Sequence, residues 1–393
     1  MTEIRTPVHE RSAASQLKLD LARFADLGKI VVCPTSRSPL RLVGRDELKR
    51  RVEASDEWRI GPDVVGAFVS EESGRAYAVQ GPVVNFLPAE SLRLKLGSSP
   101  QIDSARVDSS DEAKSSVRRW YDEFGWQTNE QGMYYDSAVF SQNAPVGNGL
   151  YELLSHLRVL ERLSGGEWLV DAASGAIAHP EYLTYSWFYT RRVCVDFSIT
   201  ALHEAAKKLR ATDYCCQADI CQLPFRDGVF EGGISGYTIQ HIPDSQQETA
   251  VRELYRVLSP NSHLCFFTDV EIGRAHDIVR RAIRACAALV GSRPSRRERP
   301  LAEAAGGAPN APSALYFRAR STAWWRDLAG SLTPSSSVET LRLLTRNEFR
   351  GVFGESNRAA RVLDALESCF PKALAFASAY CLVDLRKPST PVE

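Results

Sequence analysis

Short apolar runs alternate, through the second half of the chain, with stretches in which apolar residues recur every three or four positions. The apolar runs predict strands over residues 168–171, 192–196, 213–219, 230–235 and 263–268. The intervening periodic stretches predict helices over residues 179–190, 199–209 and 246–258. Strands that alternate with helices predict an α/β fold with a doubly wound, mostly parallel sheet and right-handed crossovers.

The remaining residues divide by composition around this region. We expect a helical leader over 1–28, a small β-rich domain over 29–98, a polar linker over 99–116 and a main domain over 117–387. An insertion follows the predicted strand 263–268 and runs over about 271–345. From residue 338 the pattern predicts helices that lead to a last strand over 379–385.

Composition and charge narrow the class of protein. With 44% hydrophobic and 24% charged residues, the 393-residue chain has the mix of an ordinary globular protein. Equal numbers of basic and acidic residues, 48 each, argue against a non-specific nucleic-acid binder. No apolar run is long enough to span a membrane, and the N-terminus lacks a secretory pattern. Nine scattered cysteines indicate reduced thiols and a cytoplasmic protein.

Three acidic residues each close one of the first three predicted strands. Asp171 opens a turn of small residues that contains Gly175, Asp196 ends the second strand, and Asp219 follows the third. Ligands bind at the carboxyl ends of strands in open α/β sheets, where a tight turn brings backbone N–H groups close to the ligand. Asp196 is placed to accept the two hydroxyls of a ribose, and Asp219 to bind an adenine amino group. Capping of the following helix or loop remains the alternative for each acid.

Five sequence elements in this region occur in a characteristic order. They are Asp171 with Gly175, Asp196, Asp219 with Leu223-Pro-Phe225, His241-Ile-Pro-Asp244, and Arg256-Val-Leu-Ser-Pro260. In this order and spacing, over residues 117–385, the chain resembles the class I S-adenosylmethionine-dependent methyltransferases. The resemblance implies a Rossmann-like fold, S-adenosylmethionine as cofactor and S-adenosylhomocysteine as product.

The resemblance also implies which residues contact the cofactor. That set is Asp171, Ala173, Gly175, Asp196, Phe197, Asp219, Ile220, Ser235 and Tyr121. The chain departs from the family at Ala173 and Ile177, where glycine is usual. If Ala173 adopts a positive φ, the substitution costs on the order of 1 kcal/mol. Ala-Ser-Gly at this turn is similar to a subgroup of the family, so we expect the turn to bind the cofactor.

The N-terminal domain resembles a small zinc ribbon that is associated with several methyltransferases. Cys33-Pro-Thr-Ser36 and Ser70-Glu-Glu-Ser73-Gly stand where that ribbon has its two cysteine pairs. Three of the four ligand positions are therefore serine, which is a poor zinc ligand. We expect the ribbon fold without zinc, and no metal site elsewhere.

Substrate and catalysis are expected near the cofactor's sulfur. Aromatic residues that precede the first strand, Tyr121, Trp126, Tyr134 and Tyr135, are placed to cover the sulfonium, although a core seam is an equal alternative. After strand 230–235, Tyr237 and His241 are the candidate catalytic residues, with His241 as base. A loop-supporting role for His241 remains open.

Residues 291–313 combine Pro, Gly and four arginines, Arg293, Arg296, Arg297 and Arg299, without an apolar period. They are interpreted as a solvated linker or as a lid that binds an anionic acceptor. Trp324 and Trp325 belong to the same insertion and are candidates for acceptor specificity.

The leading interpretation is a methyltransferase that acts on a small-molecule acceptor in biosynthesis, in a specialised pathway. An enzyme that uses S-adenosylmethionine for cyclisation or elimination and a non-catalytic binding partner remain alternatives. No nucleic acid or membrane is expected as a partner, and a homodimer is left open.

Overall fold

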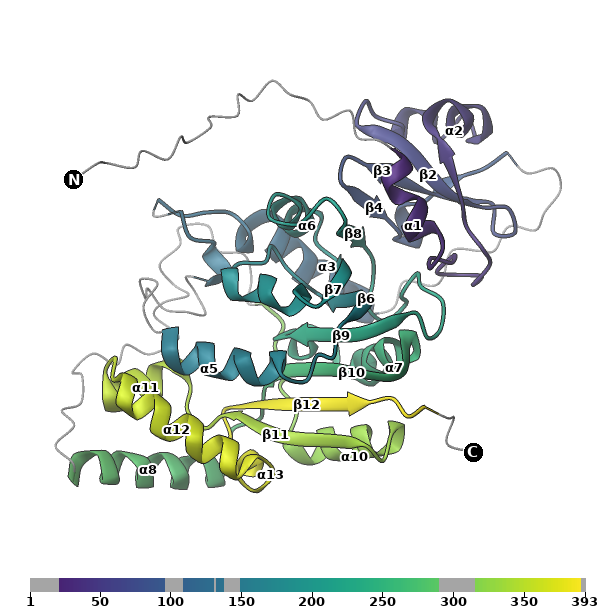
Figure 1. The fold of residues 1–393 in the computed structure, drawn as a ribbon. Coiled ribbons are helices and arrows are strands. Elements are labelled where there is room, and N and C mark those ends of the chain that lie inside the picture. The colour runs from purple at the N-terminus through teal and green to yellow at the C-terminus, as the bar shows by residue number, and fades with distance from the viewer. Residues whose placement is uncertain (1–20, 96–108, 131, 138–148, 290–314, 390–393) are drawn as a thin grey trace, which may run out of the picture.

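The computed structural model describes residues 21–95, 109–130, 132–137, 149–289 and 315–389. Its framework is one sheet in the strand order β1-β2-β3-β4-β8-β7-β6-β9-β10-β12-β11, with β5 paired to β3. In Figure 1 the N-terminal strands lie at one end of the molecule, and the helices α8, α11, α12 and α13 lie at the other. The parallel central strands confirm the predicted α/β class.

The central strands begin close to the predicted positions. Their bounds are β6 (Gly166–Ala172), β7 (Tyr189–Asp196), β8 (Tyr214–Gln217), β9 (Phe230–Gly236) and β10 (Leu258–Asp269). At one edge β12 (Tyr380–Arg386) runs antiparallel to both β10 and β11 (Ser336–Arg342). All five parallel strands end at the same edge of the sheet, where the acids at the ends of β6 and β7 therefore come together.

Both faces of the sheet are covered, because successive side chains of a strand point to opposite faces. Val170, Cys216 and Phe266 join a core cluster that includes residues of α1, α7 and α10. Their neighbours point the other way: Leu169 and Cys265 pack against α5 and η5, and Cys215 packs against α6. Cys215 and Cys216 thus lie in different cores, as expected for adjacent strand residues.

Helices connect and flank the strands. Those of the main domain are α3 (Ser109–Trp120), η4 (Tyr121–Gly125), α5 (Gly149–Leu160), η5 (Pro180–Ser186), α6 (Ile199–Ala206), η6 (Ile239–His241), η7 (Asp244–Gln246), α7 (Gln247–Val257), α8 (Arg274–Leu289), α10 (Thr322–Leu332), α11 (Arg346–Phe353), α12 (Asn357–Cys369), α13 (Pro371–Leu374) and η8 (Ala375–Ala377). Side chains at the N-cap support α6, α10, α11 and α12, and α11 has a complete capping box of Thr345 and Glu348.

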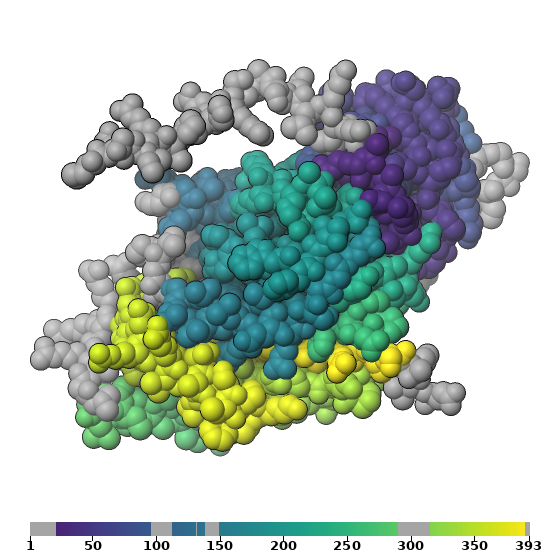
Figure 2. All heavy atoms as spheres, viewed as in Figure 1, coloured from purple at the N-terminus to yellow at the C-terminus, as the bar shows by residue number. Residues whose placement is uncertain are grey.

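The N-terminal strands extend the same sheet. They are β1 (Arg41–Gly44), β2 (Val64–Ser70), β3 (Arg75–Gln80), β4 (Val83–Asn85) and β5 (Leu92–Arg93), with η1 (Leu21–Phe24), α1 (Ala25–Gly28), α2 (Arg45–Arg51), η2 (Glu57–Arg59) and η3 (Pro88–Glu90). Strand β4 pairs in parallel with β8. Phe24, Phe68 and Phe86 share a core cluster with residues of the central strands, so this region packs on the main domain. Figure 2 shows the two parts in direct contact.

Several expectations about elements need correction. Residues 109–116, assigned to a linker, form the first part of α3. The helix expected over 179–190 is the shorter η5, because β7 already begins at Tyr189. Residues 336–342, expected to be helical from 338 onward, form strand β11, whose Glu339 and Arg342 are buried with charged partners.

No helix within the described ranges is long and apolar enough to cross a membrane. The expected leader over 1–28 is helical in its described part, residues 21–28. Residues 1–20, most of the linker and the segment 291–313 with its four arginines lie outside the described residues.

Candidate functional site

The turn after β6 holds three left-handed residues in alternation. Ala173, Gly175 and Ile177 have φ values of 52°, 56° and 49°. Such a conformation costs an L-residue other than glycine roughly 1–2 kcal/mol, and it is rarest for a β-branched residue. Ile177 is held there by burial against Leu202 and Ala205 of α6. The surrounding structure therefore enforces the turn although only one of the three positions is glycine.

Asp196 lies directly beside this turn. Its carboxylate accepts hydrogen bonds from Gly175 N at 2.9 Å and from Ser198 N at 2.8 Å. Burial raises the pKa of Asp196 to about 6, although both backbone donors favour the ionised form. The end of β7 thus holds a carboxylate against the turn through two backbone N–H groups.

Asp171 has a different environment from the one expected. Its carboxylate is buried and paired with Arg192 of β7, whose Nε lies 3.0 Å from Oδ2. Arg192 Nη1 also donates to the carbonyl of Tyr182 at 2.8 Å, which ties β7 to η5. The contacts of Asp171 thus neutralise a buried arginine. The proposed contact with a cofactor remains a prediction.

Asp219 follows β8, and its carboxylate also has hydrogen-bond partners within the protein. Its Oδ1 accepts from Cys221 N at 2.8 Å, and its Oδ2 accepts from Lys114 of α3 at 2.5 Å. Ile220 is 7% exposed and belongs to the main core. The Phe197 ring is covered by the guanidinium of Arg118, 5.3 Å from its centroid.

The segment from α3 to Trp126 therefore lies over the carboxyl ends of β6, β7 and β8. Trp126 packs on Gly175, where an added Cβ would lie 2.6 Å from the indole. Tyr121 stacks on Trp126 at 5.4 Å, and its ring meets that of His241 at 6.2 Å. Tyr121 opens a π-helical turn, a rare feature that is frequent at functional sites. The structure thus brings Tyr121, Gly175, Asp196 and His241 into one region.

Asp136 was not among the residues selected from the sequence. The Tyr121 hydroxyl and the charge of Asp196 both act on the Asp136 carboxylate. Burial raises the pKa of Asp136 to about 7. An acidic residue directly after Tyr134 and Tyr135, in a run of aromatic residues, was the available signal.

A second group of polar side chains lies at the same edge of the sheet, at the ends of β9, β10, β11 and β12. Tyr237, with a φ of 52°, follows β9, and its hydroxyl accepts from Arg342 Nη2 at 2.7 Å. Arg342 is 4% exposed, pairs with Glu152 of α5 at 2.8 Å and covers the Tyr380 ring at 4.2 Å. Strand register places Asp269, Tyr380 and Arg342 side by side. Arg342 and Glu152 were missed because they are distant in sequence from every motif.

Burial changes the proton affinity of these groups. It raises the pKa of Tyr237 to about 12, so its hydroxyl stays protonated. It raises the pKa of Asp269 to about 6. It lowers the pKa of His241 to about 4, and His241 Nδ1 lies 3.0 Å from the carbonyl oxygen of Tyr316. His241 is therefore neutral at pH 7 and is fixed by the loop that follows residue 314.

Two further residues that were expected near the site, Ser235 and Trp325, are both buried. Ser235 Oγ is buried and has no hydrogen-bond partner among the described residues. Trp325 is 1% exposed and packs on Phe266 in the main core, so it is a structural residue and does not line an acceptor site.

The four positions that resemble zinc ligands form a hydroxyl network around one thiol. Cys33 Sγ lies 3.4 Å from Ser73 Oγ and 3.3 Å from Tyr77 Oη, and Ser36 and Ser70 are joined through Ser38. Burial opposes ionisation of Cys33, but the surrounding hydroxyls outweigh it and lower the pKa of the thiol to about 6. Within the described ranges, no group of three or more His, Cys, Asp or Glu side chains is arranged to hold a metal ion.

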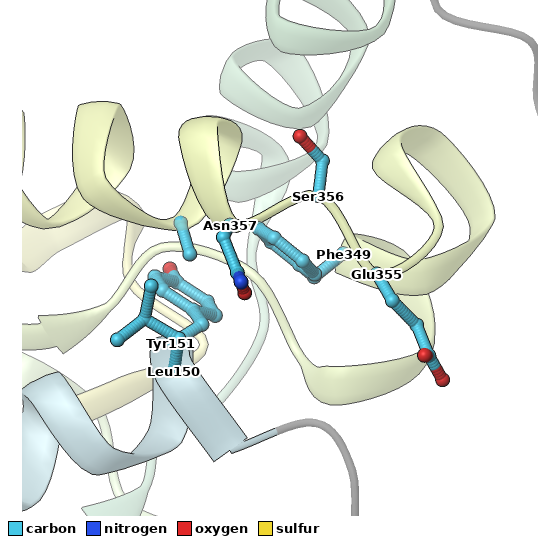
Figure 3. Close-up of a pocket in the computed structure, with 7 residues that line it drawn as sticks. Leu150, Tyr151, Phe349, Glu355, Ser356 and Asn357 are labelled. Atoms are coloured by element: carbon cyan, nitrogen blue, oxygen red, sulfur yellow. The ribbon is translucent and has the colours of Figure 1, made fainter.

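Two cavities lie away from the Gly175 turn. Figure 3 shows one of about 10 Å³, where Leu150 and Tyr151 of α5 face Phe349 of α11 and Asn357 of α12. That volume admits about one water molecule. The other is a groove of about 260 Å³ in the N-terminal region, beside Trp58, Arg59 and Glu90. Neither includes a residue of the turn or of the polar group around Arg342.

One family model and several solved structures are similar to parts of this chain. Residues 170–266 match the family model of a methyltransferase domain, and no curated protein matches the chain. The phosphoethanolamine N-methyltransferase 2 of Haemonchus contortus is 15% identical, with 76% of this chain and 63% of that chain covered and a TM-score of 0.43. DhpI, in complex with SAM and HEP, is 15% identical, with 72% of this chain and 100% of that chain covered and a TM-score of 0.40. A chain from a Haloferax volcanii complex between a methyltransferase activator and a methyltransferase is 14% identical, with 64% of this chain and 96% of that chain covered and a TM-score of 0.38.

The family match spans β6 to β10 and includes the left-handed turn, Asp196, Asp219 and the loop after β9. Residues 170–266 are therefore a class I S-adenosylmethionine-dependent methyltransferase domain.

Proposed function

We propose that this protein binds S-adenosylmethionine over the turn at Ala173–Ile177 and transfers its methyl group to a small-molecule acceptor in a specialised biosynthetic pathway. The observation that carries the proposal is the left-handed turn itself. Three alternating positive φ values beside the Asp196 carboxylate persist although two of the three residues are strained by them. Strain of this kind is retained where the backbone must approach a ligand.

The residues present fit the cofactor. Asp196 would hold the ribose hydroxyls, and Asp219 with Ile220 would hold the adenine, for which Lys114 must share or release the Asp219 carboxylate. The buried Ser235 Oγ has no hydrogen-bond partner among the described residues, so it is a polar atom that a ligand would satisfy. When bound, S-adenosylmethionine supplies an electrophilic methyl group on a sulfonium. The chain's task is to align an acceptor with it and to exclude water.

The polar group around Arg342 supports an acceptor site on the other side of Tyr237. Arg342 and Glu152 fix the Tyr237 hydroxyl, which remains protonated and is suited to donate a hydrogen bond. Asp269 has a pKa of about 6 and accepts from Gln240 Nε2 at 3.0 Å. With a pKa closer to neutrality than that of His241, it is the better proton acceptor for a hydroxyl or amine nucleophile. His241 then supports the loop, which was the alternative role for it.

Incubation with S-adenosylmethionine labelled on its methyl group, together with pools of small metabolites, tests this proposal. Label should move to a small molecule, with S-adenosylhomocysteine as co-product, and Asp196→Ala should abolish the transfer. Methylthioadenosine without a methylated product would instead indicate cyclisation or elimination chemistry. Cofactor binding without turnover on any pool would indicate a binding partner. The match of residues 170–266 to a methyltransferase domain supports methyl transfer over both.

A further inference from the structure

A continuous row of ion pairs and hydrogen bonds joins the N-terminal region to the carboxylate of Asp196. Its first member is Glu90 of η3, whose Oε1 lies 2.5 Å from Arg118 Nη1 on α3. The other carboxylate oxygen of Glu90 accepts from Asn85 Nδ2 of β4 at 2.7 Å. Because β4 pairs in parallel with β8, the Glu90 carboxylate is anchored to the sheet that carries the candidate site.

Arg118 continues this row of contacts in two directions. Its Nε donates to Asp122 Oδ2 at 3.3 Å, and its guanidinium lies 5.3 Å from the centroid of the Phe197 ring. Asp122 Oδ1 in turn accepts from Ser198 Oγ at 2.5 Å. The backbone N–H of Ser198 donates to Asp196 Oδ1 at 2.8 Å. Side chains of α3 and η4 therefore reach both residues at the carboxyl end of β7 that are expected to contact the cofactor.

The charges in this row of contacts alternate in sign. Glu90 and Asp122 are anions with Arg118 between them, and all three side chains are partly buried. Partial burial limits screening by salt, so such pairs are screened less than exposed ones. Burial raises the pKa of Asp196, and the negative charge of Asp122 adds to this effect. Arg118 therefore offsets a charge that would otherwise favour the protonated form of Asp196.

From these contacts we infer that Arg118 is a positioning residue for the cofactor site, and that Glu90 links the N-terminal region to that site through it. The inference rests on the proposed function, in which Asp196 holds the ribose of S-adenosylmethionine. Arg118 acts on the site through its neighbours, the Phe197 ring on one side and the Asp122 carboxylate on the other. The N-terminal region therefore contributes to cofactor affinity as well as to the shared core.

Calorimetric titration of single variants with S-adenosylhomocysteine tests the inference. Arg118→Gln should weaken binding about fivefold, because a partly buried ion pair and a cation–π contact are lost together. Arg118→Lys keeps the charge and should recover part of that loss. Glu90→Ala should weaken binding about threefold, because Arg118 then loses one of its two anionic partners. Arg119→Gln, at the exposed neighbouring position of α3, is the matched control and should leave affinity unchanged.

A double-mutant cycle distinguishes positioning from a general loss of stability. If Arg118 acts through the end of β7, Arg118→Gln should cost at most about twofold further affinity once Asp196→Ala is present. Should Arg118→Gln not fold, the same cycle with Glu90→Ala decides the question. Unchanged affinity in the single variant, or full additivity in the cycle, would overturn the inference. If the wild type binds no S-adenosylhomocysteine, the proposed function itself fails.

Discussion

Replacement of Ala173 by glycine should stabilise this protein, although alanine-to-glycine changes usually destabilise. Ala173 has a φ of 52°, a conformation that costs an alanine roughly 1–2 kcal/mol. Glycine removes that strain, and the greater freedom of the unfolded chain takes back about 0.5–1 kcal/mol. The net change in the free energy of unfolding should therefore lie between about 0 and +1.5 kcal/mol.

Ala178 offers a matched control in the same connection. It is partly buried, as Ala173 is, but its φ is not positive. Ala178→Gly should lower the free energy of unfolding by about 0.5–1 kcal/mol, because only the entropic loss applies. Urea unfolding followed by tryptophan fluorescence would measure both variants, and their difference should be about 1–2 kcal/mol. If Ala173→Gly destabilises as much as Ala178→Gly, the turn is not strained and the reasoning from its geometry is wrong.

Three further predictions concern buried charge, metal and pH. Arg192→Met leaves the Asp171 carboxylate buried without its partner, so thermal unfolding should show a loss of about 3–5 kcal/mol, whereas Arg192→Met combined with Asp171→Leu should recover part of it. The purified protein should carry no stoichiometric zinc by elemental analysis and should unfold identically with and without a chelator, because three of the four positions that resemble zinc ligands are serine; one zinc per chain would contradict this. The pKa of Asp269 is raised to about 6 by burial, so the folded state binds more protons than the unfolded state between about pH 4 and pH 6, and stability should fall as the pH rises through that range. Asp269→Asn should reduce the slope in urea titrations at pH 4, 5, 6 and 7, and an unchanged slope would refute the assignment.

The sequence predicted the parallel strands well because they are buried on both faces. Runs such as Trp168-Leu-Val-Asp171 contain little that is polar, and each run ends where an acid and small residues follow. Strand β11 was missed for the opposite reason. Its Glu339 and Arg342 are typical of an exposed surface, and only their partners Arg162 and Glu152, which are distant in the sequence, make them compatible with burial.

The candidate site was predicted in outline. The resemblance to the family directed attention to the turn and to Asp196, which the structure places together. The pairing of Asp171 with Arg192 could not be predicted, since it depends on the register between β6 and β7. Asp136 and Arg342 were missed because their importance comes from neighbours brought in by folding, Tyr121 in one case and Tyr237 in the other. The assignment of individual site residues to the cofactor remains a prediction.

Calorimetric titration of the wild type and of Asp196→Ala with S-adenosylhomocysteine tests directly whether the cofactor binds over the turn at Ala173–Ile177. We expect the wild type to bind one S-adenosylhomocysteine per chain. Asp196→Ala should lose at least tenfold in affinity, because two hydrogen bonds to a charged acceptor, each contributing about 1.5–3 kcal/mol, disappear. No binding by the wild type, or equal affinity in the two proteins, would contradict the placement of the cofactor over the turn at Ala173–Ile177.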